Sequence, residues 1–412
     1  MISCDFAPNE QLDDALLSLK LIAQPWRWFY GTELKKVEAL ILKILFHVNN
    51  LNDDRHKNVK LFLTGRSALY YLLNSLKLPK NSEVIIQAFT CEAVVLPIIA
   101  NHLRPVYADI ENQTFSLNPI DLEKKITEKT KVIILQHSFG IPPKHRERIQ
   151  TVAKQHHLLL IEDIAHGFGN ITMKQFNNET IYLMSFGRSK AISSVFGGAI
   201  VTNSNEIMKQ LNNITMQLPQ LSSSFIFRIL LYKPLSLLIK STYDLYLGKI
   251  IHKLINFLKI LPPEITQKEK KGEYHHFFDK AYPNALAILL LHQLKKFDRI
   301  NIQRAKVCEI YSQKILNLKS KILNLSLGRY PMLIKDRDKI LHKARQQNIF
   351  LGQWYSQPVA PRGLNLKNVG YQIGSCPVAE KVCQQIINLP TNIKISEANK
   401  IVRTLNNLTL MI

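Results

Sequence analysis

The sequence predicts an α/β protein with a mostly parallel central sheet, helices on both faces of that sheet, and a smaller C-terminal α+β domain. Short β-rich runs alternate with helical stretches between residues 61 and 203, which is the pattern of βαβ units. After residue 312, shorter strands and helices alternate again, as in a second unit. A length of 412 residues suggests two or three domains and allows a large buried core. The β-rich runs are 84–87, 132–136, 158–162, 181–185 and 198–202.

The composition favours a globular protein, since 46% of the residues are hydrophobic and 21% are charged. The formal net charge of +23 suits an anionic partner, although a Lys- and Asn-rich composition can arise without one. The acidic start lacks the pattern of a secretory signal, and no uncharged apolar run is long enough to span a membrane, so we expect a cytoplasmic protein. The five cysteines are widely scattered, so neither a disulfide framework nor a metal site is expected.

The chain is expected to begin with a helical arm over residues 1–56. Apolar residues recur every three or four positions in DDALLSLKLIA and in ELKKVEALILKILFHV, which is the helical period. Residues 57–220 then form the large domain that holds the sheet.

The first candidate site is a turn that follows an apolar run, Thr64-Gly65-Arg66-Ser67, and leads into a helix. In such a turn, free backbone N–H groups and the positive end of the helix face an anion such as phosphate. A capped turn without any ligand would leave the same pattern.

The second candidate site is the end of the run 158–162, where Glu162 and Asp163 follow one another. A carboxylate at a buried strand end needs a positive partner, because its desolvation is otherwise costly. An aspartate that caps the next turn is the alternative. The glycines that follow, Gly167 and Gly169, do not complete a dinucleotide fingerprint.

The third candidate site is Lys190, five residues after Ser185 and ahead of a Gly-Gly pair. A solvated surface charge is one interpretation. The other is a desolvated lysine that a nearby cation, such as Arg188, keeps neutral enough to attack a carbonyl. An anion turn, a strand-end carboxylate and a lysine, in this order, supply what pyridoxal phosphate requires: a phosphate cradle, an acid opposite the ring nitrogen and an amine for the aldehyde.

Several stretches extend this pattern, among them TGRSAL (64–69), EVIIQAFTCEAVV (83–95), IEDIAHGFG (161–169) and SFGRSKAISSVFGGAIVTN (185–203). Through them the chain resembles the DegT/DnrJ/EryC1/StrS sugar aminotransferases, within the fold type I pyridoxal phosphate enzymes. The resemblance implies a homodimer with shared active sites. It also implies transfer of an amino group, from glutamate as the donor, to a keto sugar carried on a nucleotide. Cell-surface polysaccharide or glycoconjugate biosynthesis would use the product.

The resemblance also implies roles for single residues. Lys190 would be the Schiff-base lysine and would then move the proton between substrate carbon and cofactor. Asp163 would hold the proton on the pyridine nitrogen. His166 stands where many relatives carry glutamine beside the phenolic oxygen of the cofactor, and an imidazole can make a similar hydrogen bond.

The phosphate would be bound by Ser185 and by the turn Gly65, Arg66 and Ser67. Arg66 replaces a small hydroxyl residue that is common at this place in the family. Its guanidinium could pair with the phosphate or point away to a helix.

Other departures from the family pattern concern the surroundings of the cofactor. Cys91 stands where an aromatic residue often stacks on the ring, which implies looser packing or a stacking partner from elsewhere, such as His137. The chain also has Asp279-Lys-Ala-Tyr-Pro-Asn284 where relatives often show Asn-Tyr-Arg-Met. Residues 276–412 are expected to form the interface helix, with a helical pattern over 285–311, and the small domain.

Residues 221–275 are expected to form a basic, amphipathic helical insertion ending in a polar loop, TQKEKKGE. In 221–261, six Lys or Arg residues face a single acid, Asp244. The later part places its apolar residues on one helical face and its lysines toward the other. Such a helix could rest on an anionic membrane surface, giving a peripheral contact with the inner membrane face, or could pack on its own sheet or on the partner subunit.

Two other functions fit parts of the pattern. A pyridoxal phosphate-dependent sugar dehydratase would keep the cofactor, but those relatives typically carry His in place of the lysine, and Lys190 is present. A non-catalytic protein of this fold could use its charge to hold a membrane or nucleic acid. No DNA-binding motif is evident, so no specific nucleic-acid partner is expected.

Overall fold

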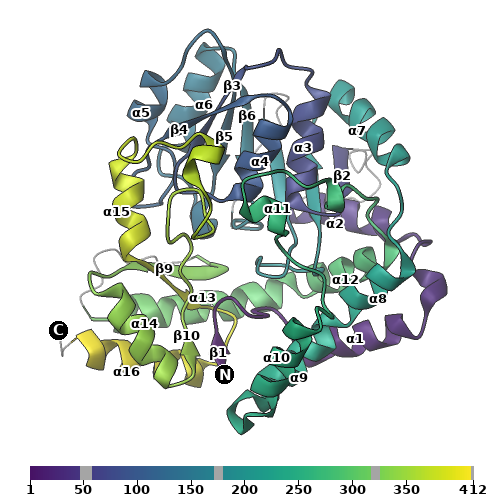
Figure 1. The fold of residues 1–412 in the computed structure, drawn as a ribbon, viewed down its shortest axis with the longest axis vertical. Coiled ribbons are helices and arrows are strands. Elements are labelled where there is room, and N and C mark those ends of the chain that lie inside the picture. Colours follow the sequence, from purple (N-terminus) through teal and green to yellow (C-terminus); the bar gives the residue numbers. More distant parts are fainter. Residues whose placement is uncertain (47–57, 171–179, 317–324, 410–412) are drawn as a thin grey trace.

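The computed structural model describes residues 1–46, 58–170, 180–316 and 325–409. Within them, a seven-stranded sheet has the order β2-β8-β7-β6-β5-β3-β4 (Figure 1). β8 runs antiparallel to β2 and β7, and every other adjoining pair is parallel, which confirms the mostly parallel sheet. The strands are β2 (Val59–Phe62), β3 (Glu83–Gln87), β4 (Arg104–Ala108), β5 (Thr130–Gln136), β6 (Leu159–Asp163), β7 (Thr180–Ser185) and β8 (Gly198–Val201).

Helices cover both faces of this sheet, as expected. Alternate residues of each strand point to opposite faces, so Ile86 and Ile134 pack in one cluster with α3 (Gly65–Ser75), α4 (Glu92–Ala100) and α7 (Asn205–Gln217). Ile85 and Ile133 pack on the other face with α5 (Pro119–Lys124) and α6 (Arg146–Gln155). Near β2 and β7, that face is covered by α2 (Glu33–Phe46) and α12 (Asn284–Lys295).

The C-terminal part forms the smaller α+β unit. Its strands β9 (Arg329–Leu333) and β11 (Ile386–Pro390) pair antiparallel. Around them lie β10 (Ile349–Phe350), α14 (Arg337–Gln346), α15 (Pro377–Gln385) and α16 (Ile395–Thr409).

The N-terminal arm differs from the helical expectation at its start. A short strand, β1 (Ile2–Ser3), pairs in parallel with β10 of the small unit. The helices α1 (Leu12–Ile22) and α2 then follow as predicted, and the residues 47 and 48 of the predicted second helix lie outside the described part of the chain. The chain start therefore lies against the C-terminal unit, beside the sheet domain.

The helical pattern over 285–311 is divided into two helices, α12 and α13 (Phe297–Lys314), with a break at Lys296. Most of α12 is buried within its own chain, against α1 and α2. Single turns of 3-10 helix complete the fold: η1 (Pro25–Arg27), η3 (Ser138–Gly140), η4 (Tyr243–Leu245), η5 (His276–Phe278) and η6 (Leu366–Val369).

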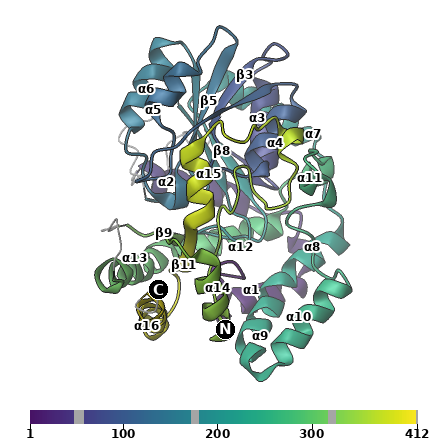
Figure 2. The ribbon, with the colours of Figure 1, turned by 60° about the vertical axis from the view of Figure 1, so that its left-hand side comes forward.

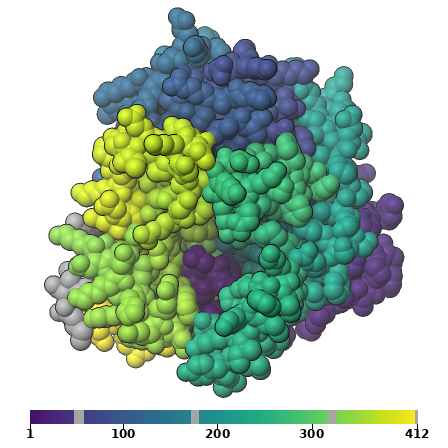
Figure 3. Space-filling view, in the orientation of Figure 1, coloured from purple at the N-terminus to yellow at the C-terminus, as the bar shows by residue number. Residues whose placement is uncertain are grey.

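The insertion folds as α8 (Ser223–Leu230), α9 (Tyr232–Thr242), η4 and α10 (Leu247–Phe257). α9 is anchored to the molecule by Lys233, whose buried ammonium binds Glu10 at 2.8 Å and the carbonyl of Ser193 at 3.3 Å. The hairpin of α9 and α10 projects from the lower edge of the molecule in both ribbon views (Figures 1 and 2) and in the space-filling view (Figure 3). No helix in the described ranges is long and apolar enough to cross a bilayer.

The expected polar loop after the insertion contains one helical turn, α11 (Gln267–Lys270). Thr266 and Glu269 form a capping box, each binding the backbone N–H of the other. The sequence carries this signal, T-x-x-E, and the prediction of a loop was wrong here because it rested on polarity alone.

Candidate active site

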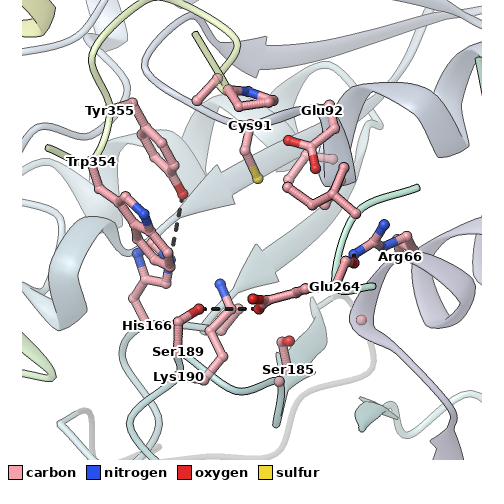
Figure 4. Close-up of a pocket in the computed structure, with 18 of the residues that line it drawn as sticks. Arg66, Cys91, Glu92, His166, Ser185, Ser189, Lys190, Glu264, Trp354 and Tyr355 are labelled. Carbon is pink, nitrogen blue, oxygen red and sulfur yellow. Dashed lines mark hydrogen bonds between the residues drawn. The ribbon is translucent and has the colours of Figure 1, made fainter. Parts of the chain in front are cut away.

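A cavity of about 380 Å³ opens at the carboxyl ends of β6 and β7, between the sheet and the small unit. Ligands of open α/β sheets bind at this edge. Four distant parts of the chain line it: the ends of the strands, the N-terminal segment with Asp5, the end of the insertion with Glu264, and the small unit with Arg329 and Trp354. Figure 4 shows Glu264 and Trp354 on either side of Lys190.

Lys190 extends into this cavity from the turn that follows β7 (Figure 4). Its backbone N–H donates to the carbonyl of Gly187 at 3.1 Å, and its own carbonyl accepts a hydrogen bond from Asn9. Desolvation lowers the pKa of Lys190, while the charges of Cys91 and Asp163 oppose that shift. A lowered pKa increases the neutral amine fraction at a given pH, and the neutral amine is the nucleophile.

Arg188 is not the cation beside this lysine, so that part of the prediction was wrong. Its guanidinium lies over the ring of Tyr232, 4.5 Å from the centroid, and donates to the carbonyl of Pro262 at 2.7 Å. The cation that lowers the pKa of Lys190 is Arg329, from β9 of the small unit.

The two acids at the end of β6 point to opposite sides of the strand, as the period of two requires. Asp163 lines the cavity, and its carboxylate accepts hydrogen bonds from Gln136 Nε2 and the N–H of Ala165, both at 3.0 Å. Glu162 is fully buried away from it and binds His137 Nε2 at 2.8 Å and Arg146 Nε at 2.9 Å. Asp163 is therefore the acid available to a ligand.

The predicted anion turn lies at the other end of the cavity, where α3 begins. Gly65 and Ser185 come so close that a Cβ on Gly65 would lie 3.0 Å from the Cβ of Ser185. Both residues line the cavity. Ser67 does not: its N–H donates to the Thr64 hydroxyl at 3.1 Å, and its own hydroxyl donates to the carbonyl of Phe278 at 3.2 Å. Thr64 caps the helix through the Ser67 N–H, and the Ser67 side chain is turned away from the cavity, contrary to its prediction as a phosphate-binding residue.

Arg66 turns toward α11, which decides between its two predicted orientations. Its guanidinium forms an ion pair with the buried Glu269, donates to the carbonyl of Glu264 at 2.6 Å, and lies 5.0 Å from the ring centroid of Phe278. The side chain thus fastens the segment after the insertion to the start of α3.

That segment brings an acid, Glu264, to the end of the cavity near Ser185, and sequence reasoning missed this residue. Glu264 Oε1 accepts a hydrogen bond from the Ser189 hydroxyl at 3.3 Å (Figure 4). Glu92, at the start of α4, also lines the cavity, and burial raises its pKa to about 7 against the opposing charge of Arg66. The hydroxyl of Ser189 is occupied by Glu264, so the groups left for an anion at this end are the hydroxyl of Ser185 and the backbone at Gly65.

Aromatic side chains form the wall opposite the sheet. The ring of His166 stacks on Trp354 with 5.2 Å between centroids, and its Nδ1 accepts a hydrogen bond from the N–H of Phe139 at 3.3 Å. Burial and the charges of Lys190 and Arg329 hold the pKa of His166 well below its usual value, so the ring is neutral. Its Nε2 then carries the proton and faces the cavity side, 3.5 Å from the hydroxyl of Tyr355.

Cys91 lines the cavity at the N-cap of α4, and burial raises the pKa of its thiol to about 11. The thiol is therefore neutral. It is also smaller than an aromatic side chain, so it leaves free volume in the cavity at this position. His137 also reaches the cavity, but its ring is bound to Glu162, whereas the stacked aromatic pair of the wall is Trp354 and Tyr355.

The residues present fit pyridoxal phosphate. One cavity brings together an amine of lowered pKa, a buried carboxylate held by two N–H donors, and a glycine turn at a helix start with a facing serine. These are the three groups that the sequence order predicts, and the cavity has the volume of a small-molecule site.

The model of the DegT/DnrJ/EryC1/StrS aminotransferase family matches residues 55–220 and 269–406. The chain belongs to this family. It is 24% identical over 354 residues to dTDP-4-amino-4,6-dideoxy-D-glucose transaminase of Shigella dysenteriae, a match that covers 82% of each chain. GDP-perosamine synthase of Escherichia coli O157:H7 is 35% identical over 141 residues, which is 34% of this chain and 38% of that protein.

Solved structures agree with the fold of the family. The crystal structure of NtdA from Bacillus subtilis, with the bound cofactor PMP, has a TM-score of 0.69 and 20% identity, and the match covers 96% of this chain and 81% of that one. The DegT/DnrJ/EryC1/StrS member described here is therefore a pyridoxal phosphate-dependent aminotransferase of fold type I. Between its two matched ranges, the family model leaves residues 221–268 unmatched, and this stretch contains the helical insertion.

Proposed function

We propose that this aminotransferase moves an amino group from glutamate to a keto sugar linked to a nucleotide, for cell-surface polysaccharide or glycoconjugate biosynthesis. One observation carries the proposal: Lys190 and Asp163 face a single cavity whose far end is formed by Gly65 and Ser185. The similarity to sugar-synthesising transaminases supports a sugar as the acceptor.

Each residue has a role in this proposal. Pyridoxal phosphate, when bound, supplies an electron sink for the carbon that gains or loses the amino group. Lys190 would hold the cofactor through its amine, and the same amine would move the proton to and from the substrate carbon. Asp163 would hold the proton on the ring nitrogen of the cofactor, and the neutral imidazole of His166 and the thiol of Cys91 line the same cavity.

The phosphate is assigned to Ser185 and to the backbone N–H groups at Gly65, where the helix dipole favours negative charge. Arg66 contributes by holding Glu264 and Glu269, since its guanidinium is already paired.

A second cavity supports a nucleotide-linked acceptor. It has a volume of about 330 Å³ and shares Asp5, Gln353 and Trp354 with the first. Tyr243 and Phe350 offer aromatic rings to a nucleobase, and Arg345 offers a cation to a phosphate. The sugar would lie at Lys190 while the nucleotide extends into this second space.

The test is a screen of nucleotide-linked keto sugars with glutamate, following the cofactor spectrum and the mass of the product. We expect glutamate alone to convert the bound cofactor to its amino form and one keto sugar to convert it back. We also expect the free sugar to have a kcat/KM at least about tenfold lower than its nucleotide-linked form, because the second cavity then stays empty. Keto-deoxysugar without aminated product would instead indicate dehydration.

The enzyme is proposed to be a cytoplasmic homodimer with shared active sites. Leu12, Leu16 and Leu19 form an exposed apolar stripe on α1, with spacings of four and three residues. Asp13, beside this stripe, is already paired with Arg299 at 3.7 Å and with Lys296 at 3.1 Å, so the proposed contact between two copies rests on the apolar stripe. Light scattering should give twice the chain mass. Leu16→Asp should raise the dimer dissociation constant at least about tenfold, because it places a charge in the apolar contact. An unchanged dissociation constant would mean that the dimer interface lies elsewhere.

A further inference from the structure

The insertion leaves one surface of the molecule apolar and open to solvent. Ile250 is 64% exposed and Phe257 is 80% exposed on α10, and Leu245 is 75% exposed in the turn before it. The remaining exposed apolar members are Tyr246, Leu247, Leu254 and Leu258, and the lysines beside them are Lys249, Lys253 and Lys259. We call these residues together the α10 surface.

Around the axis of α10, the exposed apolar residues, the lysines and the buried residues lie on different sides. Leu247, Ile250, Leu254 and Phe257 recur with helical spacing, so they form one stripe, while Lys249 and Lys253 follow one another at the side of it. On the opposite side, Ile255 and Gly248 are buried against α9 and η4. α10 therefore has a covered side, an open apolar side and a cationic flank.

The hairpin is fastened to the molecule, so the open side is a fixed feature. Arg228 donates to the carbonyls of Lys259 and Ile260, at 2.6 and 2.7 Å, and ties the end of the hairpin to α8. On α8, the carbonyl of Leu230 accepts the hydroxyl of Ser18 at 2.7 Å. The helices α8 and α9 thus pack on α1 of their own chain, whereas the apolar stripe of α10 stays open.

The positive charge beside the apolar stripe favours an anionic partner. The only acid in 221–261 is Asp244, and its carboxylate is bound by Asn348 Nδ2 of the small unit at 2.9 Å. The lysine flank is thus left without acids from its own segment. A second copy on this face would bring the same lysines together, whereas an anionic surface would complement them.

We infer that the α10 surface docks on the surface of an anionic lipid bilayer. The apolar stripe enters the boundary between headgroups and acyl chains, and Lys249, Lys253 and Lys259 reach the lipid phosphates. Since α10 is short and no described helix can span a bilayer, the contact is peripheral. The inference goes beyond the aminotransferase activity, and neither depends on the other.

Sedimentation of the holoenzyme with lipid vesicles tests this inference. We expect a partition coefficient at least ~10-fold higher for vesicles containing 30% phosphatidylglycerol than for pure phosphatidylcholine vesicles, and a decrease with added NaCl. Ile250→Ser/Phe257→Ser should lower binding to the anionic vesicles at least ~10-fold. Lys249→Glu/Lys253→Glu should remove the preference for anionic lipid.

The matched control is Met216→Ser/Ile373→Ser, which removes two apolar side chains that are 83% and 75% exposed elsewhere on the molecule. This control should bind vesicles as the wild type does. Equal recovery of wild-type protein with and without anionic vesicles overturns the inference. So does a change of oligomeric mass in Ile250→Ser/Phe257→Ser, because the stripe would then contact another copy of the chain. Transamination in solution, measured with Ile250→Ser/Phe257→Ser, should stay at the wild-type level.

Discussion

Replacing Lys190 by alanine should lower turnover by about 10⁴-fold or more, because the variant loses both the nucleophile and the group that moves the proton. The visible absorbance of the lysine-linked cofactor should disappear, although pyridoxal phosphate can still bind through Asp163 and the phosphate end. Absorbance spectra of the reconstituted protein and product formation with glutamate and a keto sugar measure the two effects.

Lys209→Ala provides the comparison, since Lys209 is exposed on α7 and away from the cavity. This variant should keep the spectrum and the turnover of the wild type. If Lys190→Ala retained both signals, Lys190 would not be the reacting amine, and the assignment of the site would have to be abandoned.

Replacing Asp163 by asparagine should lower kcat about 10² to 10³-fold, the range found when one electrostatic partner of a reacting centre is removed. The amide keeps the size of the side chain and can still accept from the N–H of Ala165, so the loss comes from the missing negative charge. A protonated ring nitrogen then lacks its counter-ion, and the electron sink weakens. The bound cofactor should also show a shifted absorbance maximum, which a purely structural defect would not cause.

Replacing the neighbouring acid, Glu162, should affect stability more than kcat. Glu162→Gln removes a buried charge that pairs with Arg146 and His137 on the far side of the strand. We expect it to lower the unfolding temperature, because breaking a buried ion pair costs about 3 to 5 kcal/mol, while kcat falls far less than in Asp163→Asn. The opposite ranking of the two variants in kcat would contradict the assignment of Asp163.

The sheet was predictable because its strands carry a local signal. Short β-rich runs separated by helices mark βαβ units, and the polar residues that end them must meet at one edge of the sheet. Lys190, Asp163 and Ser185 could be placed together for this reason, and the structure brings all three to one cavity. The period of two along a strand predicts that Glu162 and Asp163 lie on opposite sides of it, and the family resemblance indicates Asp163 as the acid that faces the ligand.

The cavity residues outside the sheet domain could not be predicted from the local sequence pattern. Arg329 and Trp354 come from the small unit, and Asp5 comes from the chain start, so only the tertiary fold brings them to Lys190. Arg329 lies over the ring of Trp354 at 3.4 Å from its centroid and pairs with Asp5, yet no spacing in the sequence links these three. The orientation of Arg66 depends in the same way on Glu269, which lies 203 residues further along the chain.

The buried ammonium of Lys233 has a practical consequence for any attempt to shorten the enzyme. It holds the insertion to Glu10 and to the carbonyl of Ser193, three residues beyond Lys190. Deleting the hairpin would leave the buried Glu10 carboxylate without its counter-ion. It would also remove the hydrogen bond to the Ser193 carbonyl, in the backbone segment that positions the Lys190 amine. A truncated protein would then lose activity for reasons unrelated to lipid. Substitutions of single exposed side chains on the α10 surface are therefore the way to separate membrane binding from transamination.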